Sequence, residues 1–373
     1  MKPPRLPDEM RSASDRPPVA EGILRVDMLT RVPAVLREVG LDADATIAGI
    51  GIDPRIFDDP GNEIPVASLG RLLRVASARS GCAHLGLLIG RRSSLDEQGL
   101  LGQLVRHSPD VGTALRNLTA HLHLRDRGAV APLLVSDGAA SLGYEIYQPH
   151  VEGIDQIGVG AMAIGANILR SLCGKGWRPS ELLFAHRPPA DLRPHRRFFD
   201  APLHFDADRT ALVFPARWLG HRIAGADPAQ FEALSKQVDA LERQTGADLP
   251  TEIRRMLRVV LLTRKGSVEE FSIRLGIHRR TLNRRLRAQG TSLHRLVEEI
   301  RSEIARQLVG NTRMSLTDIA ATLGYADASA FTRAFRRWTR GLPSAWRAAH
   351  SAPRESGRRA APFGPADPRG PRP

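Results

Sequence analysis

The 373-residue sequence has little cysteine and no long uninterrupted hydrophobic run. Cys82 and Cys173 are too few for a disulfide framework, which fits a reducing compartment. The N-terminal stretch is rich in proline and charge and lacks the apolar core of a signal peptide. The most apolar stretch, 157–173, is interrupted by Asn167 and Arg170 and falls short of a membrane span. These absences favour a cytoplasmic protein with no membrane partner.

The sequence also lacks the residue spacings of metal sites and active sites. His121 and His123 stand close together, but the other histidines are scattered and no thiol lies near them, so no metal and no cofactor are expected. The glycine-rich stretch 158–167 lies inside an apolar helical segment and lacks the strand-then-loop context of a phosphate-binding loop, which favours core packing. We therefore expect a protein that is not an enzyme.

Positive charge is present in excess, but it is unevenly distributed. The formal net charge of +14 divides into −1 for residues 1–250, +12 for residues 251–350 and +3 for the remaining tail. A near-neutral body joined to a basic segment is typical of a protein in which only that segment meets nucleic acid or an acidic surface.

A chain of this length exceeds the usual size of a single domain, so two domains are expected. In the first, apolar residues at helical spacing are followed by strand patterns on both sides of Asp137-Gly138, a typical hairpin turn. A long helix over 157–172 and further short strands complete the pattern. Residues 21–230 are thus predicted to form an α+β domain.

The pattern changes after this domain. Residues 231–247 are polar and helical in pattern, as expected of a linker, and residues 248–350 are helical throughout. The two ends of the chain, 1–20 and 351–373, are rich in proline and charge and cannot form a core, so both are predicted to be disordered.

The helical domain contains a duplicated unit. Residues 267–276 read SVEEFSIRLG and residues 315–324 read SLTDIAATLG, 48 positions later, and the match continues past the glycine with one residue inserted. The serine that begins each copy has an acidic residue three positions later, the spacing of a helix capping box. The glycine that ends each copy suits a sharp turn into a second helix. We predict two helix-turn-helix units, at 267–287 and 315–338.

The second helix of each unit has an apolar back and a polar front. Leu286 in the first copy, and Phe331 and Phe335 in the second, are expected to pack inward. The front is expected to face DNA, because arginine neutralises phosphates and both arginine and asparagine bind purine edges. The predicted DNA-binding residues are Arg279, Arg280, Asn283, Arg284 and Arg287 in the first unit and Ser329, Thr332, Arg333, Arg336 and Arg337 in the second.

Between the two units, residues 292–310 place aliphatic side chains along one face of a single long helix. At the usual rise per residue, such a connecting helix is roughly 25 Å long. It would hold the two recognition helices about one DNA turn apart, roughly 34 Å, in successive major grooves. The expected partner is double-stranded DNA.

This domain resembles the DNA-binding domain of the AraC/XylS family of bacterial transcription regulators. The likeness is greatest in SLTDIAATLGYADASAFTRAFRRWTRGLPSAWR, residues 315–347. The front half, in stretches such as EQGLLGQLVRHSPDVGTALRNLTAHLHL, is similar to the arabinose-binding-type domain of the family's ornithine- and arginine-utilisation branch. The resemblance implies a front domain that senses a small molecule or forms a homodimer, and a rear domain that binds promoter DNA and contacts RNA polymerase.

The sequence leaves the effector and two alternative functions open. Arg125, Tyr144, Tyr147 and His150 are neighbours in sequence and are candidates for lining an effector pocket. A DNA-processing enzyme of the recombinase or repair type could use the same helical module, but it would need a carboxylate cluster or an activated cysteine in the front domain. A regulator that acts by dimerisation alone would need no effector. The favoured hypothesis is a sequence-specific DNA-binding transcription regulator controlled by a small molecule.

Overall fold

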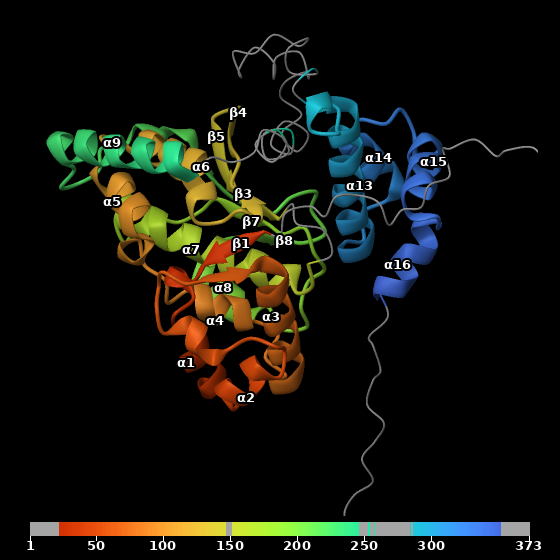
Figure 1. Cartoon of the computed structure of the whole chain (residues 1–373), viewed down its shortest axis with the longest axis horizontal. Helices are drawn as coiled ribbons and strands as arrows, with labels where there is room; N and C mark the ends of the chain where they lie inside the picture. Colours follow the sequence, from red (N-terminus) through yellow and green to blue (C-terminus); the bar gives the residue numbers. More distant parts are fainter. Residues whose placement is uncertain are drawn as a thin grey trace, which may run out of the picture.

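The computed structural model describes residues 22–146, 151–245 and 286–351, together with positions 253, 257 and 284. Figure 1 shows a larger body of helices and strands, built from residues up to 245, and a smaller helical body drawn in blue. The predicted α+β domain followed by a helical domain is thus confirmed. Both chain ends and most of the first helix-turn-helix unit lie outside the described residues.

The N-terminal domain begins with a helical layer. In α3 (Val66–Ser80) an apolar stripe formed by Leu69, Leu72 and Leu73 is buried. Strands β1 and β2 pair antiparallel at the edge of this layer. Its remaining elements are β1 (Ile23–Arg25), η2 (Val26–Met28), α1 (Val32–Glu38), α2 (Ala43–Ala48), η3 (Pro54–Phe57), β2 (Glu63–Pro65) and α4 (Leu85–Gly90).

Two further helices, α5 (Gly99–His107) and α6 (Val111–His121), pack against each other. The Asp110 carboxylate accepts the backbone N–H of Thr113 and so caps the start of α6. The short 3-10 helices η4 (Asp96–Gln98) and η5 (Leu122–Leu124) flank the pair.

A five-stranded sheet has the order β4-β5-β9-β7-β8. Strands β4 and β5 form the predicted hairpin about Asp137-Gly138, and only β7 and β8 run parallel. The elements of this part are β4 (Leu133–Ser136), β5 (Ala139–Gly143), β7 (Glu181–Leu183), α8 (Arg193–Phe199), β8 (Leu203–His204), β9 (Ala211–Pro215) and η6 (Ala216–Gly220).

The chain leaves this sheet at Tyr144. The alternation of Leu142, Tyr144 and Ile146 suits one continuous strand, but β5 ends at Gly143 and the Tyr144 N–H donates to the Thr210 carbonyl. The next two residues form β6 (Glu145–Ile146), which pairs with β3 (Ala129–Val130) in a separate sheet. Tyr144 therefore stands between two sheets rather than within one.

The central helix of the domain is α7 (Ile154–Cys173). It is long and apolar enough to cross a membrane, but two thirds of it is buried inside the domain, as expected of a core helix. It packs closely on α4: a Cβ added at Gly86 would lie 1.9 Å from the Gln156 carbonyl oxygen, and one at Gly90 would lie 2.3 Å from that of Gly160. Within the glycine-rich stretch itself, a Cβ added at Gly160 would lie 3.1 Å from the Gly86 carbonyl oxygen and one at Gly165 would lie 2.9 Å from the Leu212 side chain. These glycines therefore serve packing, as the sequence indicates.

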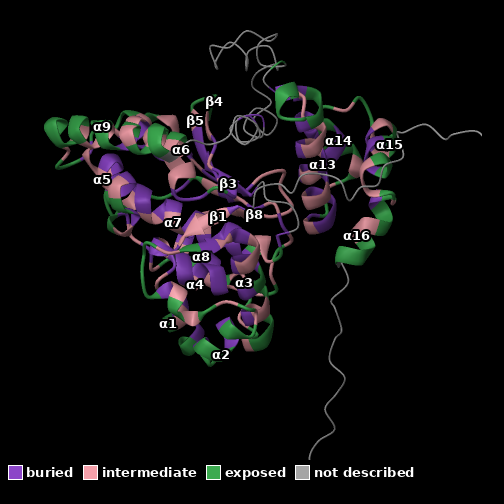
Figure 2. Cartoon of the chain, viewed as in Figure 1, coloured by how far each residue is buried: buried purple, intermediate pink, exposed green. Residues whose placement is uncertain are grey.

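Two hydrophobic cores fill the N-terminal domain, and α7 contributes to both. The larger core lies between α5, α6, α7 and the five-stranded sheet and includes Phe214 and Met162, while the smaller core lies among α1 to α4 and includes Leu36 and Ile157. Figure 2 shows the buried residues concentrated in the middle of the domain, between these layers. A pocket lies at the boundary between the two cores.

The stretch expected to be a linker is instead a packed helix. In the structure α9 (Pro228–Thr245) lies against α5 (Figure 1), and Val238 is buried in the larger core. The mainly polar sequence of 231–247 is that of a surface helix with a narrow apolar edge. The structure of the N-terminal domain therefore continues to Thr245.

The C-terminal domain is built around one long helix. Its apolar stripe, including Leu296, Ile300 and Ile304, is buried in a third hydrophobic core, as predicted. The Ser292 hydroxyl accepts the Arg295 N–H and fixes the start of this helix. The described helices of the domain are α13 (Leu293–Asn311), α14 (Leu316–Thr322), α15 (Ala328–Thr339) and α16 (Pro343–Ser351).

Helix α13 also contacts the N-terminal domain. The Arg187 N–H donates to the Asn311 carbonyl at 3.0 Å, and the Gln307 side-chain amide donates to the Ile146 carbonyl at 3.1 Å. A cavity of about 680 Å³ with many charged lining residues opens between the domains. The two domains thus share an interface that includes the far end of β6.

Candidate nucleic-acid interface and effector pocket

The turn of the second helix-turn-helix unit follows the predicted chemistry. The Ser315 hydroxyl accepts the Asp318 N–H at 3.1 Å and also lies 2.6 Å from the Asp318 carboxylate, so the pair caps α14. After α14 the chain turns at Gly324, whose φ of 75° is the left-handed conformation that glycine adopts most easily. The turn brings α15 across α14.

The back of α15 is held by aromatic packing. Phe331 and Phe335 are fully buried, and their rings lie 5.7 Å apart. Phe335 also meets Trp346 of α16 edge-on at 6.0 Å. The Asp327 carboxylate accepts the Ala330 N–H and caps the start of α15. These contacts fix which face of α15 is turned outward.

The outward face of α15 is basic and exposed. Ser329, Arg333 and Arg336 are exposed. The side chains of Arg333 and Arg336 have no ion-pair partner in the part of the chain that the structure describes. Two guanidinium groups on one side of a helix that begins after a glycine turn can bind phosphates or purine edges in a major groove.

Two other residues predicted to contact DNA are engaged within the protein. The Thr332 hydroxyl donates to the Ala328 carbonyl at 2.7 Å, and Thr332 is only partly exposed. The Arg337 guanidinium lies 2.5 Å from the Glu298 carboxylate of α13, which also accepts the Trp338 indole N–H. These two side chains link α15 to its own backbone and to α13.

The structure describes part of the first helix-turn-helix unit. Leu286 is buried in the third core, whereas Arg284 and Arg287 are exposed, which is the inward and outward division that the sequence predicts. Arg279, Arg280 and Asn283 lie outside the described residues. Helix α13, which follows, has 19 residues and is about 28 Å long at the usual helical rise.

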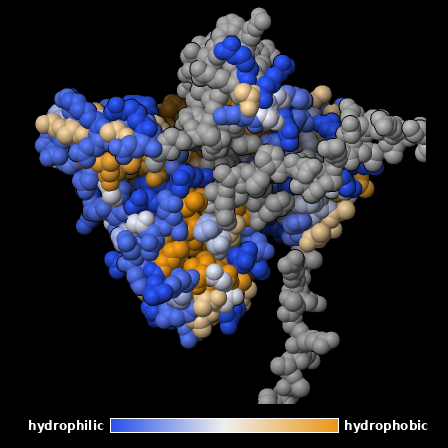
Figure 3. All heavy atoms as spheres, in the orientation of Figure 1, coloured by the Kyte–Doolittle hydropathy of each residue, from blue (hydrophilic) through white to orange (hydrophobic). Residues whose placement is uncertain are grey.

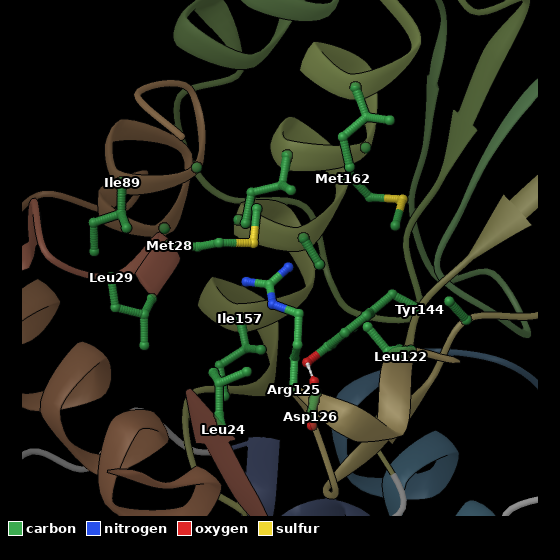
Figure 4. A pocket seen from close by; sticks show the side chains of 18 of the residues that line it. Leu24, Met28, Leu29, Ile89, Leu122, Arg125, Asp126, Tyr144, Ile157 and Met162 are labelled. Atoms are coloured by element: carbon green, nitrogen blue, oxygen red, sulfur yellow. Dashed lines mark hydrogen bonds between the residues drawn. The ribbon is translucent and has the colours of Figure 1, made fainter. Parts of the chain in front are cut away.

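The N-terminal domain holds a largely apolar pocket with a cavity volume of about 130 Å³, at the boundary between its two cores. We call it the effector pocket. Of the four residues predicted to line an effector site, Arg125 and Tyr144 line this pocket, while Tyr147 and His150 lie outside the described residues. Figure 4 shows the Arg125 guanidinium in the middle of the pocket, facing Met28.

The charge of Arg125 is neutralised inside the pocket. Its Nε donates to Asp27 Oδ2 at 3.0 Å, its Nη2 donates to Asp27 Oδ1, and its Nη1 donates to Gln98 Oε1 at 2.8 Å. All three side chains are buried, with exposed fractions of 8% or less. A bidentate pair of this kind keeps a buried guanidinium charged and fixed. Asp27 and Gln98 were not predicted, because they lie 98 and 27 positions from Arg125 in the sequence.

Tyr144 is another polar residue that lines the pocket. Its hydroxyl donates to Asp126 Oδ2 at 2.5 Å, as the dashed line in Figure 4 marks, and Asp126 Oδ1 accepts the Gly128 N–H. Burial raises the pKa of Asp126, and the hydrogen bonds from Tyr144 and Gly128 oppose that rise. Tyr144 therefore has a fixed orientation at the edge of the pocket.

The histidines are less scattered than the sequence indicates. His121 and His123 approach Glu242 of α9, with Nε2 to Oε1 distances of 3.7 and 3.3 Å. His121, Asp239 and Glu242 have potential metal-ligand atoms within 4.8 Å of one another. The sequence did not indicate this group, because its members are far apart along the chain. The carboxylates of α9 pair with the end of α6 and help to hold α9 in place.

Cys173 does not have the properties of an activated nucleophile. Burial raises the pKa of the Cys173 thiol to about 12, the opposite of what a reactive cysteine needs. The Cys82 sulfur lies 3.7 Å from His84 Nδ1, and both cysteines are partly buried. Cys173 thus gives no support to the DNA-processing alternative.

Comparisons with known proteins agree with this geometry. Residues 40–223 match the family described as the arabinose-binding domain of AraC transcription regulators, N-terminal, and residues 271–349 match a helix-turn-helix domain family. The chain is 29% identical to the ornithine utilization regulator of Pseudomonas aeruginosa, over 84% of this chain and 93% of that protein. It is 25% identical to the HTH-type transcriptional regulator VirS of Mycobacterium tuberculosis, over 87% and 96%.

A solved structure, that of the transcriptional regulator CdpR from Pseudomonas aeruginosa, shares 24% identity over 70% of this chain and 86% of that chain, with a TM-score of 0.37. That score is too low for the superposition to support an argument.

The exposed basic helix and the two matched domains define a DNA-binding transcription regulator, not an enzyme. The chain belongs to the AraC family.

Proposed function

We propose that this regulator binds a small-molecule effector in the effector pocket and that binding changes how its DNA-binding domain engages promoter DNA. The pocket is largely apolar, contains a neutralised ion pair and lies between two cores, where a ligand can alter how they pack. Clefts between packed units are common positions for ligand sites. The match to an arabinose-binding domain supports the same assignment.

The observation that carries this proposal is the short connection between the pocket and α13. Tyr144 lines the effector pocket, and two residues later the Ile146 carbonyl accepts a hydrogen bond from Gln307 of α13. Tyr144 and Gln307 also line one small cavity at the domain interface. A ligand that moves Tyr144 would therefore shift the strand to which α13 is bonded. Such a two-state element is what coupling between sites requires.

The proposed DNA contacts are Arg333 and Arg336 in the second unit and Arg284 and Arg287 in the first. All four residues are exposed in the structure. We also propose that Arg279, Arg280 and Asn283 complete the first recognition helix. From the family to which the chain belongs, we propose that it acts in the cytoplasm as a homodimer and contacts RNA polymerase. The effector domain is proposed to extend from residue 21 to the end of α9, and the DNA-binding domain to span 248–350.

Filling the pocket tests the proposal. Ala161 of α7 lines the pocket and is only partly buried, so Ala161→Phe places a ring in the cavity. The control is Ala48→Phe, at an exposed position on α2. Promoters bound in cells are mapped first, and one of them then drives a reporter. We expect Ala161→Phe to abolish the change in reporter output between growth conditions, while Ala48→Phe behaves as wild type. An unchanged response of Ala161→Phe would exclude this pocket as the effector site.

A further inference from the structure

The wall of the effector pocket is almost entirely hydrocarbon. Met28, Leu29, Ile89, Ile157 and Met162 face it from several different elements, as Figure 4 shows. Figure 3 also shows hydrophobic residues gathered on the face of the N-terminal domain that is turned toward the viewer. A hydrocarbon wall favours burial of the apolar surface of a ligand, but it has no hydrogen-bond partner for a hydroxyl group and no counter-ion for a charge.

Some hydrogen-bond donors at the pocket have no acceptor, whereas the carboxylates nearby already accept hydrogen bonds from neighbouring residues. Arg125 directs three N–H groups at Asp27 and Gln98, and a guanidinium has five. The side-chain nitrogen of Gln98, Nε2, is buried and has no hydrogen-bond partner among the described residues. The carboxylates of Asp27 and Asp126 already accept from Arg125 and Tyr144.

From these two observations we infer that the pocket binds a mainly apolar molecule with one head group that accepts hydrogen bonds, such as a carbonyl or a carboxylate. The tail would fill the hydrocarbon cavity, and the head would accept from Gln98 Nε2 and the remaining N–H groups of Arg125. This inference rests on the proposed effector role of the pocket and specifies the chemistry of its ligand.

The same groups argue against a sugar or a basic amino acid. A sugar brings several hydroxyl donors, but the carboxylates around the pocket already accept from neighbouring groups. Ornithine brings two ammonium groups, and burying an unpaired charge costs far more than burying a neutral acceptor. A ligand of either kind fits the polar cavity between the domains better, because Glu152, Asp155 and Glu303 line it.

The size of the pocket limits the ligand further. Its volume of about 130 Å³ is close to that of an apolar engineered cavity of about 150 Å³ that binds benzene. One ring, or an alkyl chain of comparable volume, fills such a space. Each additional buried methylene should tighten binding by about fourfold until the cavity is full.

The test is calorimetric titration of the full-length protein with named probes. The ketone arm is the methyl ketone series butan-2-one, hexan-2-one and octan-2-one, and the carboxylate arm is butanoate, hexanoate and octanoate. Octylamine, arabinose and ornithine are the comparison ligands. We expect affinity to rise about fourfold per methylene along at least one of the two acceptor-headed arms. The arm that binds more tightly identifies the head group.

Three variants assign the binding to this pocket. Ala161→Phe should abolish binding of the acceptor-headed series, and Ala48→Phe should leave it unchanged. Gln98→Met keeps the side-chain volume but removes the amide donor, so it should weaken the better head group by roughly threefold to tenfold. Thermal melting of each variant without ligand verifies that the protein is folded.

The inference is overturned if octylamine, arabinose or ornithine binds at least as tightly as the acceptor-headed series and loses binding in Ala161→Phe. It is also overturned if neither acceptor-headed arm binds. Binding of arabinose or ornithine that Ala161→Phe leaves unchanged would place those ligands elsewhere and is compatible with the inference. The proposed function is judged separately, because it fails when the Ala161→Phe reporter still responds as wild type does.

Discussion

On α15, residues that look equivalent in sequence differ in what they are free to bind. Arg333 and Arg336 extend from an exposed face, whereas Arg337 is held by Glu298 and Thr332 by its own helix. A guanidinium that must leave an ion pair before it binds DNA contributes less net affinity than one that is already free. Arg333 and Arg336 are therefore the stronger candidates for DNA contacts.

Replacing Arg333 should weaken DNA binding. In Arg333→Ala we expect a loss of about 1 to 3 kcal/mol on a cognate promoter if the side chain contacts a base, and a similar loss on scrambled DNA if it contacts a phosphate. The exposed Arg37→Ala on α1 is the control and should bind as wild type. Fluorescence anisotropy on both DNA sequences measures the difference. Unchanged affinity of Arg333→Ala on both would remove it from the interface.

A buried histidine predicts a loss of stability in acid. Burial, with the nearby charges of His84 and His186, lowers the pKa of His195 to about 4. The unfolded chain binds this proton more tightly, with a pKa of about 6.5, so protonation favours unfolding. The free energy of unfolding should therefore fall as the pH drops from about 6.5 to 4, and be lower by about 2 kcal/mol at pH 5 than at pH 8.

Urea unfolding at these two pH values measures the effect. His195→Phe removes one titrating group and should make the dependence less steep, whereas His221→Phe, at an exposed histidine, should retain it. An equally steep dependence in His195→Phe would assign the effect to other groups.

At the scale of single elements, α13 has two roles. It carries the buried stripe of the DNA-binding domain, and it bonds to β6 next to the effector pocket. Its stripe could be predicted from sequence because helical periodicity is a local property. Its bond to β6 could not, because Gln307 and Ile146 are 161 positions apart and neither belongs to a motif.

Breaking that bond should reduce effector control. Gln307→Leu removes the amide that donates to the Ile146 carbonyl, so we expect a smaller difference in reporter output between inducing and non-inducing conditions. DNA affinity of the ligand-free protein should stay close to wild type, because Gln307 is on the side of α13 that faces the N-terminal domain. Gln237→Leu on the exposed side of α9 is the control. A fully retained response would contradict coupling through this strand.

The cap of α14 should contribute measurably to stability. Ser315→Ala removes the acceptor for the Asp318 N–H, and loss of such a cap typically costs about 1 kcal/mol. Ser329→Ala, at an exposed position of α15, should have little effect. Chemical unfolding followed by tryptophan fluorescence, which reports on Trp338 and Trp346 nearby, measures both. Equal stability of the two variants would mean that the cap contributes nothing.

Across the whole molecule, sequence reasoning succeeded where the information is local or repeated. The hairpin at Asp137-Gly138, the long helices and the cap and turn of the second unit all follow from short-range patterns. It failed for α9, because a mainly polar helix with one apolar edge looks like a linker until its packing partner α5 is known. Sequence reasoning found Arg125 and Tyr144 at the pocket but missed Asp27 and Gln98, because these two residues reach Arg125 only through the fold.

The most direct test of the account is a hydroxyl-radical footprint of the full-length protein on a bound promoter. The account predicts two protected patches per protomer on one face of the duplex, separated by about one helical turn, roughly 34 Å. In Arg333→Ala the patch bound by the second unit should weaken while the other remains. A single short patch per protomer, or two patches that weaken equally in this variant, would contradict the claim that α13 holds two separate groove-reading helices.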